Sequence, residues 1–376
     1  MQALISIGPT KTDFPQSALD SAGGFVWWYV DLIDEFGNGA VCIWSFGLPF
    51  LPGLASSARR GNPIQPSARP SWTLSVFKDG KQDFYLLSEH DPSDCSWDPE
   101  QGHWRFGETH FRSSVIEGKV LLEVDYKAIA PGFPGTLIGT LRVEGPLRKS
   151  PINMERHAEH SWEPVTLGAA TGNLAIVCGD YRADLEGRAY YDRNAGDRPL
   201  HDLGIKDWYW GRFPFSDREI VVYLLMAEDS QDEHHVLEVD ERGILSHWQE
   251  PSLDMESWAR STFYSRYPKL IRVSCHNKET LHIKLQPPMD DSPFYRRFVA
   301  SCTQGEESVL GVFEHVLPHE IDPGWSRPLV HMRVHKATKP NSIWLPLFSG
   351  PKSGRWGRLF RSWLWKSRVK ELPWLK

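Results

Sequence analysis

The sequence has little cysteine and no long apolar segment, and each shortage excludes a class of protein. Its five Cys residues among 376 are widely spaced and form no Cys-x-x-Cys pair, which argues against a disulfide framework or a structural zinc site and indicates reduced thiols. No run of 18 apolar residues occurs, so no transmembrane helix is expected. The N-terminus lacks the basic start of a signal peptide. We therefore expect a cytoplasmic protein.

Motifs that bind phosphate or metal, or that activate a serine, are also missing. The chain has no Gly-x-Gly-x-x-Gly, Walker or Gly-x-Ser-x-Gly sequence, which argues against nucleotide binding and against a serine hydrolase. His315 and His319 are four residues apart, as are His331 and His335. In a strand this spacing only places two side chains on one face, and no His-Glu-x-x-His motif is present. We predict that no metal and no nucleotide is needed.

Aromatic residues and turn formers are what the sequence has in abundance. It contains 17 Trp, 18 Phe and 11 Tyr, together with 30 Gly and 28 Pro. Frequent Gly and Pro interrupt long helices and favour many short strands joined by turns. With 40% hydrophobic and 24% charged residues the composition is that of a globular protein. The net charge of -6 gives no support for nucleic-acid binding. An all-β fold is expected.

Strand-like segments fall into two sets that are separated near residues 186–216. The first set begins with a hairpin around Asn38-Gly39, and Gly118 and Gly187 are expected to form turns. Its expected strands are 25–33, 40–46, 72–77, 83–87, 102–106, 109–116, 119–128, 135–144 and 173–184. The expected strands of the second set are 219–228, 234–239, 244–247, 269–275, 280–285, 298–303, 308–317 and 329–336. Residues 48–70 are expected to form a surface loop or lid.

Two successive sets of short strands joined by turns predict two antiparallel β-barrel or sandwich domains in tandem. We place them at residues 23–186 and 187–340, after a polar lead-in at 1–22 and before a basic aromatic tail at 341–376.

Three aromatic clusters carry polar groups at strand spacing. In the first, Trp27, Tyr29 and Asp31 share one face of a strand and Trp28 lies on the other. The same alternation pairs His160 with Trp162, Tyr190 with Asp192, and Trp208 with Trp210. Core packing is one interpretation of each pair. The other is chemical, because a carboxyl group held among rings has a raised pKa and can act as a general acid, while the rings stabilise a cation.

Taken in order, these clusters resemble the carotenoid 1,2-hydratase (hydroxyneurosporene synthase) family over about residues 20–340. The segments that carry the resemblance are Gly-Gly-Phe-Val-Trp-Trp-Tyr-Val-Asp at 23–31, His-Ser-Trp-Glu-Pro at 160–164, Tyr-Tyr-Asp-Arg-Asn-Ala-Gly at 190–196 and Trp-Tyr-Trp-Gly-Arg at 208–212. The resemblance implies two lipocalin-like β-barrel domains. It also implies addition of water across the terminal C1–C2 double bond of an acyclic carotenoid, without an organic cofactor.

The resemblance also implies roles for single residues. Asp192 would protonate C2 and leave a tertiary cation at C1, Trp162 and Tyr190 would stabilise that cation, and His160 would orient a water molecule or accept its proton. The residues expected to bind the hydrophobic substrate are Trp27, Trp28, Tyr29, Asp31, Asn194, Trp208, Trp210 and Arg212.

Two other functions fit the same residues. A terpene or polyene cyclase, an isomerase or a Diels-Alderase of this fold would use the same proton donor and exclude water. A carrier of lipophilic molecules would use no proton donor at all. The sequence does not separate the hydratase from the cyclase.

The end of the chain combines rings with positive charge. Residues 352–376 hold eight Lys or Arg and one Glu, a net charge of +7, so the remaining residues carry -13. Apolar residues recur there at helical spacing: Trp356, Leu359, Phe360, Trp363 and Leu364. This composition is typical of a short helix that lies on an anionic membrane, peripheral to the inner face of the membrane. The alternative is a helix that caps a barrel.

Overall fold

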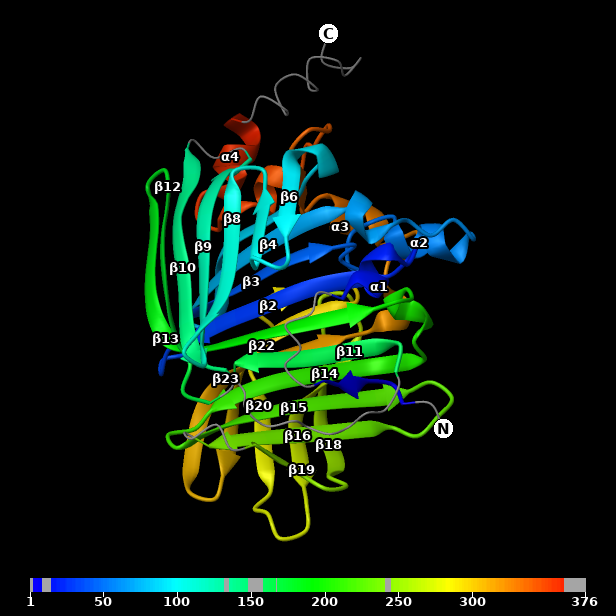
Figure 1. Ribbon diagram of the computed structural model, residues 1–376, viewed down its shortest axis with the longest axis vertical. Coiled ribbons are helices and arrows are strands. Elements are labelled where there is room, and N and C mark those ends of the chain that lie inside the picture. The colour runs from blue at the N-terminus through cyan, green and yellow to red at the C-terminus, as the bar shows by residue number, and fades with distance from the viewer. Residues whose placement is uncertain are drawn as a thin grey trace.

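The computed structural model describes residues 3–8, 15–131, 135–147, 158–166, 168–240 and 245–361. Nearly all of its regular structure is strand, in two curled and almost entirely antiparallel sheets that are stacked along the long axis of the molecule (Figure 1). The expected all-β class is confirmed.

The first sheet contains 15 of the described strands. Its main path, in spatial order, is β24 (Val334–Lys336), β5 (Lys81–Glu89), β4 (Pro70–Lys78), β3 (Gly39–Phe46), β2 (Phe25–Ile33), β13 (Tyr181–Gly196), β12 (Thr171–Cys178), β10 (Thr136–Pro146), β9 (Lys119–Ile129), β8 (Thr109–Ile116), β7 (His103–Phe106) and β6 (Cys95–Asp98). Outside this path, β11 (His160–Thr166) pairs with β13, β1 (Ser6–Ile7) with β11, and β25 (Gly350–Pro351) with β5.

The second sheet contains ten described strands. Its path is β17 (Leu245–His247), β16 (Glu233–Asp240), β15 (Arg218–Ala227), β14 (Ile205–Pro214), β23 (Glu307–Val316), β22 (Tyr295–Gln304), β20 (Leu281–Leu285), β19 (Arg266–Ser274) and β18 (Ser252–Arg260), with β21 (Asp290–Asp291) paired to β22. The chain thus leaves the first sheet after β13 and returns to it in β24 and β25. The domain division at residues 186 and 187 stays a prediction.

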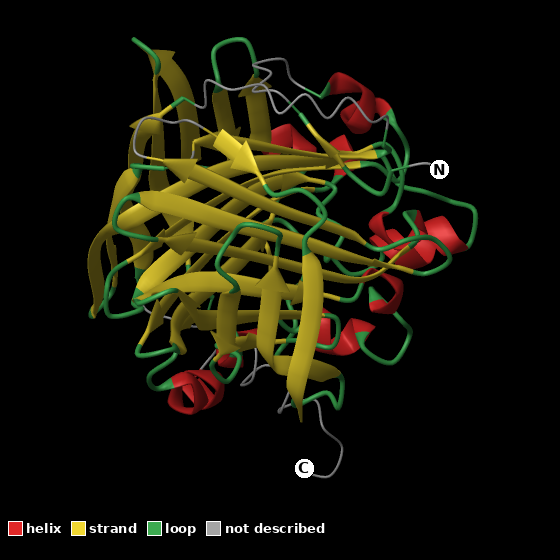
Figure 2. Ribbon diagram, turned by 90° about the horizontal axis from the view of Figure 1, so that it is seen from below, coloured by secondary structure: helices red, strands yellow, loops and turns green. Residues whose placement is uncertain are grey.

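The described helices are short (Figure 2). They are α1 (Gln16–Asp20), α2 (Leu54–Arg59), α3 (Arg327–His331) and α4 (Arg355–Arg361). Helix α4 lies at the end of the molecule that the first sheet forms (Figure 1). Within the described part of the chain, no helix has the length and apolar character needed to cross a bilayer.

The buried side chains form three cores, one inside the curl of each sheet and one between the sheets. Strand β2 separates two of them. Trp28 enters the core of the first sheet, whereas Trp27 and Tyr29 enter the core between the sheets. All nine residues of β2 are buried for this reason, which explains why its sequence is almost continuously apolar.

Several expected elements differ in the structure. Residues 173–184 are not one strand but parts of β12 and β13, because the chain turns at Gly179, whose φ of +58° is in the left-handed region. The expected linker near 186–216 is largely the long central strands β13 and β14. Gly187 lies within β13, where an added Cβ would approach the carbonyl oxygen of Ile33 to 2.3 Å. Its role is close strand packing and not a turn.

Other differences concern segments outside the central strands. Residues 329–336 form part of α3 and then β24, the expected loop at 48–70 contains α2 and buries Leu48 and Leu51, and the lead-in contains β1 and α1. Strand β11 agrees with the strand spacing expected of His160 and Trp162 and continues to Thr166. Strands β6 and β18 were not expected. Neither has a strong period-two pattern bounded by turn residues, so tertiary pairing decides their conformation.

Candidate active site

Asp192 is the most unusual ionisable group of the core between the sheets. Its side chain is buried, and its Oδ2 accepts hydrogen bonds from the Tyr190 hydroxyl at 2.7 Å and from Trp162 Nε1 at 2.8 Å. Its Oδ1 accepts a bond from Asn194 Nδ2 at 3.1 Å. Burial raises the pKa of Asp192 to about 8, although the bonds from Tyr190 and Trp162 act in the opposite direction. The carboxyl group is therefore largely protonated at neutral pH.

Strand pairing explains this cluster. Asp192 stands opposite Tyr29 on β2, and Asn194 stands opposite Trp27. On the other side of β13, Trp162 of β11 stands opposite Asn194. The alternation of side chains along β11 and β13 therefore aims Trp162, Tyr190 and Asp192 into the same space between the sheets.

His160 contacts Asp192 only through Asn194. Its Nε2 lies 3.2 Å from Asn194 Oδ1, and its ring is completely buried among aromatic rings that include Trp208 at 5.2 Å. Burial lowers the pKa of His160 to about 4, so the ring is neutral at physiological pH. With Asn194 Oδ1 as its acceptor, Nε2 carries the ring proton. His160 thereby fixes the orientation of the Asn194 amide.

Rings from the second sheet face this polar cluster. Trp208 stacks on Trp27 with ring centroids 6.0 Å apart, and Trp210 meets Tyr29 edge to face at 5.0 Å. Tyr223 of β15 lies 4.7 Å from Trp162. The two sheets therefore contact each other through aromatic side chains around Asp192.

A small cavity of about 30 Å³, enough for roughly one water molecule, lies in this contact. Both sheets and the segment between β3 and α2 line it with Trp27, Tyr29, Ile43, Leu48, Phe50, Asp192, Asn194, Trp208, Trp210, Tyr223, Tyr295, Glu314 and Val316. Trp162, Tyr190 and His160 are not among the lining residues. Trp162 and Tyr190 donate hydrogen bonds to Asp192, and His160 bonds to Asn194, from the side away from the cavity. This differs from the direct contact with a cation or with water that was expected of these three residues.

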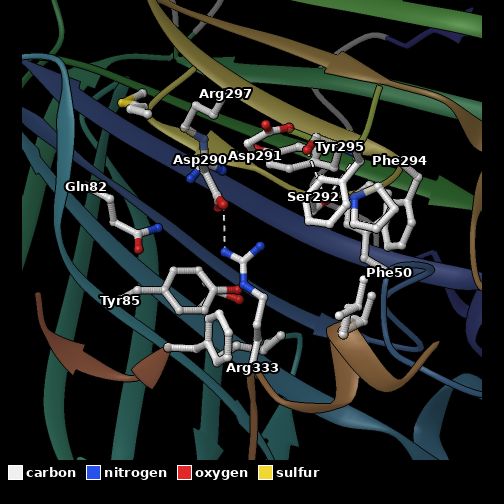
Figure 3. Close-up of a pocket in the computed structure, with 18 of the residues that line it drawn as sticks. Phe50, Gln82, Tyr85, Asp290, Asp291, Ser292, Phe294, Tyr295, Arg297 and Arg333 are labelled. Atoms are coloured by element: carbon white, nitrogen blue, oxygen red, sulfur yellow. Dashed lines mark hydrogen bonds and ion pairs between the residues drawn. The ribbon is translucent and has the colours of Figure 1, made fainter. Parts of the chain in front are cut away.

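A large cavity of about 290 Å³ adjoins the small one. The two share four lining residues, Ile43, Leu48, Phe50 and Tyr295. Figure 3 shows Phe50, Phe294 and Tyr295 grouped on one side of the large cavity, with the ion pair of Asp290 and Arg333 across from them. That pair is 2.6 Å long, and the Arg333 guanidinium also covers the Tyr85 ring at 4.6 Å. The large cavity is lined mainly by apolar surface, and the small cavity beside it is lined by Asp192.

Three residues that were expected to bind substrate lie elsewhere. Trp28 belongs to the core of the first sheet, where it stacks on Trp44 at 5.6 Å and touches neither cavity. Asp31 and Arg212 are completely buried and paired with each other at 2.5 Å, and Arg212 also reaches Glu219 at 3.4 Å. Burial raises the pKa of Glu219 to about 7. These charges compensate one another and join β2 to β14 and β15.

Several residues that line the cavities were not predicted from the sequence. Tyr223 stands opposite Trp210 in the β14–β15 hairpin, and counting outward from the turn would have placed it there. Glu314 lies on the same face of β23 as Val312 and Val316. A single charged residue on an otherwise apolar strand face could therefore have identified it from the sequence. Phe50 lies in a segment without periodicity, and no local signal marks it.

The four histidines at positions 315, 319, 331 and 335 do not form a cluster. His315 is buried on β23 and lies 2.8 Å from Asp207, whereas His331 is in α3 and His335 in β24. Among the residues that the structure describes, no group of three or more His, Cys, Asp or Glu side chains is arranged to hold a metal ion.

The C-terminal helix is partly exposed. In α4, Trp356 and Phe360 are 65% and 53% exposed, whereas Leu359 is buried. The expected apolar residues Trp363 and Leu364 lie outside the described residues. Lys352, which precedes α4, lines the large cavity.

Comparison with known proteins gives a consistent result. A family model described as carotenoid hydratase CrtC matches residues 96–342. A hydroxyneurosporene dehydrogenase of Chlorobaculum tepidum is 24% identical over 364 residues, which cover 89% of this chain and 94% of that protein. An acyclic carotenoid 1,2-hydratase of Rubrivivax gelatinosus is 21% identical over 304 residues, which cover 78% and 69%.

Solved structures of similar shape confirm the lipocalin-like fold. The protein described as AttH from Nitrosomonas europaea has a TM-score of 0.54 at 14% identity, with 84% of this chain and 99% of that chain covered. The crystal structure of CghA with Sch210972 has a TM-score of 0.53 at 15% identity, with 78% and 87% covered. At such identities the similarity concerns the fold alone.

Proposed function

The chain belongs to the carotenoid hydratase family, and from this premise we propose that it is a hydro-lyase that adds water to the terminal isoprenoid double bond of an acyclic carotenoid or a similar polyene. One observation carries the proposal. Asp192, whose pKa burial raises to about 8, lines an aromatic cavity that adjoins a larger apolar one. A proton donor at the end of an apolar space suits a substrate whose reactive bond is at the end of a long hydrocarbon.

The first step is transfer of the Asp192 proton to C2 of the terminal isoprene. Oδ2 accepts bonds from both Tyr190 and Trp162, so the acidic proton is carried by Oδ1. As this proton leaves, the two donors stabilise the carboxylate that forms. Tyr190 and Trp162 thus act as positioning residues for the acid. The π electrons of the double bond form the new C–H bond, and C1 becomes a tertiary cation.

Rings of the small cavity stabilise that cation. Trp27, Tyr29, Trp208 and Trp210 line the cavity, and the faces of aromatic rings attract positive charge, most strongly where water is excluded. His160 is neutral at physiological pH, so it adds no second positive charge near the cation. A water molecule then attacks C1, and loss of one of its protons gives the tertiary alcohol.

The reaction is proposed to need no cofactor. Addition of water neither oxidises nor reduces the substrate, so acid and base groups of the chain are sufficient for it. We expect the substrate to contact the residues that line the two cavities. Of these, the residues near the reacting carbon atoms are Trp27, Tyr29, Asn194, Trp208 and Trp210.

We also propose that the protein collects its substrate at a membrane surface, because a polyene dissolves in lipid and not in water. Support comes from the exposed rings of Trp356 and Phe360 on α4, close in sequence to Lys352 at the large cavity. Replacing Trp356 with Ser should weaken co-sedimentation with anionic vesicles. The same change at Phe36, which is 74% exposed in the turn after β2, is the matched control and should have no effect. Equal sedimentation of both variants would contradict this part of the proposal.

The hydratase itself is tested with purified protein, lycopene or neurosporene, and water labelled with ¹⁸O. A product that gains one labelled water supports hydration. An isomer of unchanged mass would instead identify a cyclase or an isomerase, and recovery of bound but unchanged polyene would identify a carrier. The Asp192→Asn variant, which keeps the shape of the side chain, should form no product.

A further inference from the structure

Glu314 is a second carboxyl group in the small cavity. It belongs to β23 of the second sheet, whereas Asp192 belongs to β13 of the first, and both line the same space. Cross-strand pairing places Glu314 between Trp210 on β14 and Arg297 on β22. Its side chain is 12% exposed, which agrees with a carboxyl group that borders a cavity.

The two carboxyl groups differ in the charge of their hydrogen-bond donors. Glu314 Oε1 accepts a hydrogen bond of 2.8 Å from Nε of the buried Arg297, and this guanidinium supplies the counter-charge that a buried carboxylate requires. Among the described residues, the donors to Asp192 are all neutral: Tyr190, Trp162 and Asn194. After burial and those hydrogen bonds, the charge of Glu314 is the next influence on the pKa of Asp192, and it raises that pKa further. The cavity is thus lined by one carboxyl group with neutral donors, Asp192, and by one that is paired with a guanidinium, Glu314.

Such a pair is the arrangement that divides acid and base roles between two groups. Resting on the proposed function, we infer that Glu314 is the catalytic base that takes a proton from the water molecule as this water adds to C1. The water oxygen forms the bond to C1, one water O–H bond breaks, and its proton passes to Glu314. Asp192 is then a carboxylate and Glu314 a carboxylic acid, and return of one proton from Glu314 to Asp192 through solvent restores the starting state.

Two other buried groups, His160 and Asp31, are placed less well for this step. His160 Nδ1 has no hydrogen-bond partner among the described residues, but His160 does not line the small cavity. Asp31 does not line it either, and its charge is compensated by Arg212. Glu314 lines the small cavity and, unlike Asp192, is paired with a guanidinium, that of Arg297.

Deuterium labelling separates the base from the acid. In D₂O, the Glu314→Gln variant still lets Asp192 deliver a deuteron to C2, but without capture the cation returns to the alkene by losing a proton from C2. We expect formation of the alcohol to fall at least about 100-fold, while deuterium enters the recovered substrate at a rate within a few-fold of wild-type protonation. Alcohol formation within threefold of wild type would overturn the inference. Equal loss of both signals in a folded variant would overturn it too.

Controls keep a failure of this inference distinct from a failure of the proposed function. Asp192→Asn should lose both exchange and hydration, and Glu320→Gln, at a 42% exposed side chain, should change neither. Because Glu314→Gln leaves Arg297 without its counter-charge, the double variant Glu314→Gln/Arg297→Gln is measured in the same way, with the same expected pattern. If wild type forms no alcohol from any acyclic carotenoid, the proposed function fails; if only Glu314→Gln behaves as wild type, the base assignment fails alone.

Discussion

The two faces of strand β2 both carry aromatic rings, yet they have different surroundings. On one face, Trp28 stacks on Trp44 with an interplanar angle of 4° and lies 4.8 Å from Trp104. On the other, Trp27 and Tyr29 meet Trp208 and Trp210 of the second sheet. The first cluster is enclosed by the curl of a single sheet, and the second is built from two.

Carboxyl groups separate the two clusters more clearly than rings do. The cluster between the sheets surrounds Asp192 and borders Glu314, whereas the Trp28 cluster packs with apolar residues such as Val30 and Leu74. A buried acid with a strongly shifted pKa is a better marker of a site than aromatic density, because a shifted pKa costs stability that packing alone does not require. Changes to the cluster around Asp192 should therefore affect turnover, whereas changes to the cluster around Trp28 should affect stability.

Replacing the acid should abolish turnover without loss of the fold. For Asp192→Asn we expect turnover to fall at least about 10³-fold, since the amide has no acidic proton to give. Activity is measured as alcohol formed per folded protein, with Asp197→Asn, an exposed position on the same segment, as the control that keeps activity. Turnover within tenfold of wild type would contradict the assignment of Asp192.

Stability should change in the opposite direction to activity. The folded-state pKa of Asp192 is about 8 against an ordinary value of 3.8, so its contribution to stability is fully present below pH 4 and is lost as the pH rises toward 8. Asp192→Asn should remove this loss, and its melting temperature relative to wild type should therefore rise between pH 5 and pH 8. Denaturation curves across this range provide the check; parallel curves would show that Asp192 ionises normally.

The two tryptophan faces should respond differently to the same substitution. Trp210→Leu removes a ring from the small cavity, and we expect turnover to fall roughly tenfold, as a cation–π contact is worth about 0.5–2 kcal/mol. Trp28→Leu should instead lower the melting temperature and leave turnover per folded molecule within about twofold. Equal losses of turnover would show that the distinction between the two faces is wrong.

Removing one donor to Asp192 should shift a pH profile. The Tyr190 hydroxyl stabilises the carboxylate and so lowers the pKa of Asp192. In Tyr190→Phe that pKa rises further, and the decline of kcat/KM at alkaline pH should move to higher pH, with a rate only a few-fold lower at pH 7. Trp162→Phe should act in the same direction. A shift of this decline toward lower pH would mean that the ionisation of another group causes it.

Chelation should have the smallest effect. After exhaustive dialysis against EDTA we expect unchanged turnover, because the proposed steps use only side chains and water. Loss of activity that one divalent ion restores would direct attention back to the histidines at 315, 319, 331 and 335.

The sequence was sufficient for most strands and for the face that carries Asp192, since period-two alternation is a local property. It was not sufficient for Phe50, whose place in the cavity depends on how residues 48–70 fold against the second sheet. Gly187 shows the same limit, because its close approach to Ile33 depends on which strand lies beside β13. Alternation alone predicts that Trp28 points away from Trp27 and Tyr29. The core of the first sheet, which Trp28 enters, forms only when that sheet curls.

The central claim is that Asp192 is protonated at neutral pH in the folded protein. Infrared difference spectra of wild type minus Asp192→Asn, recorded from pH 5 to pH 10, report directly on this carboxyl group. We predict a carboxylic-acid carbonyl band at pH 7 that disappears with an apparent pKa near 8. A carboxylate signal throughout this range, with no protonated band at pH 5 to 7, would contradict the account.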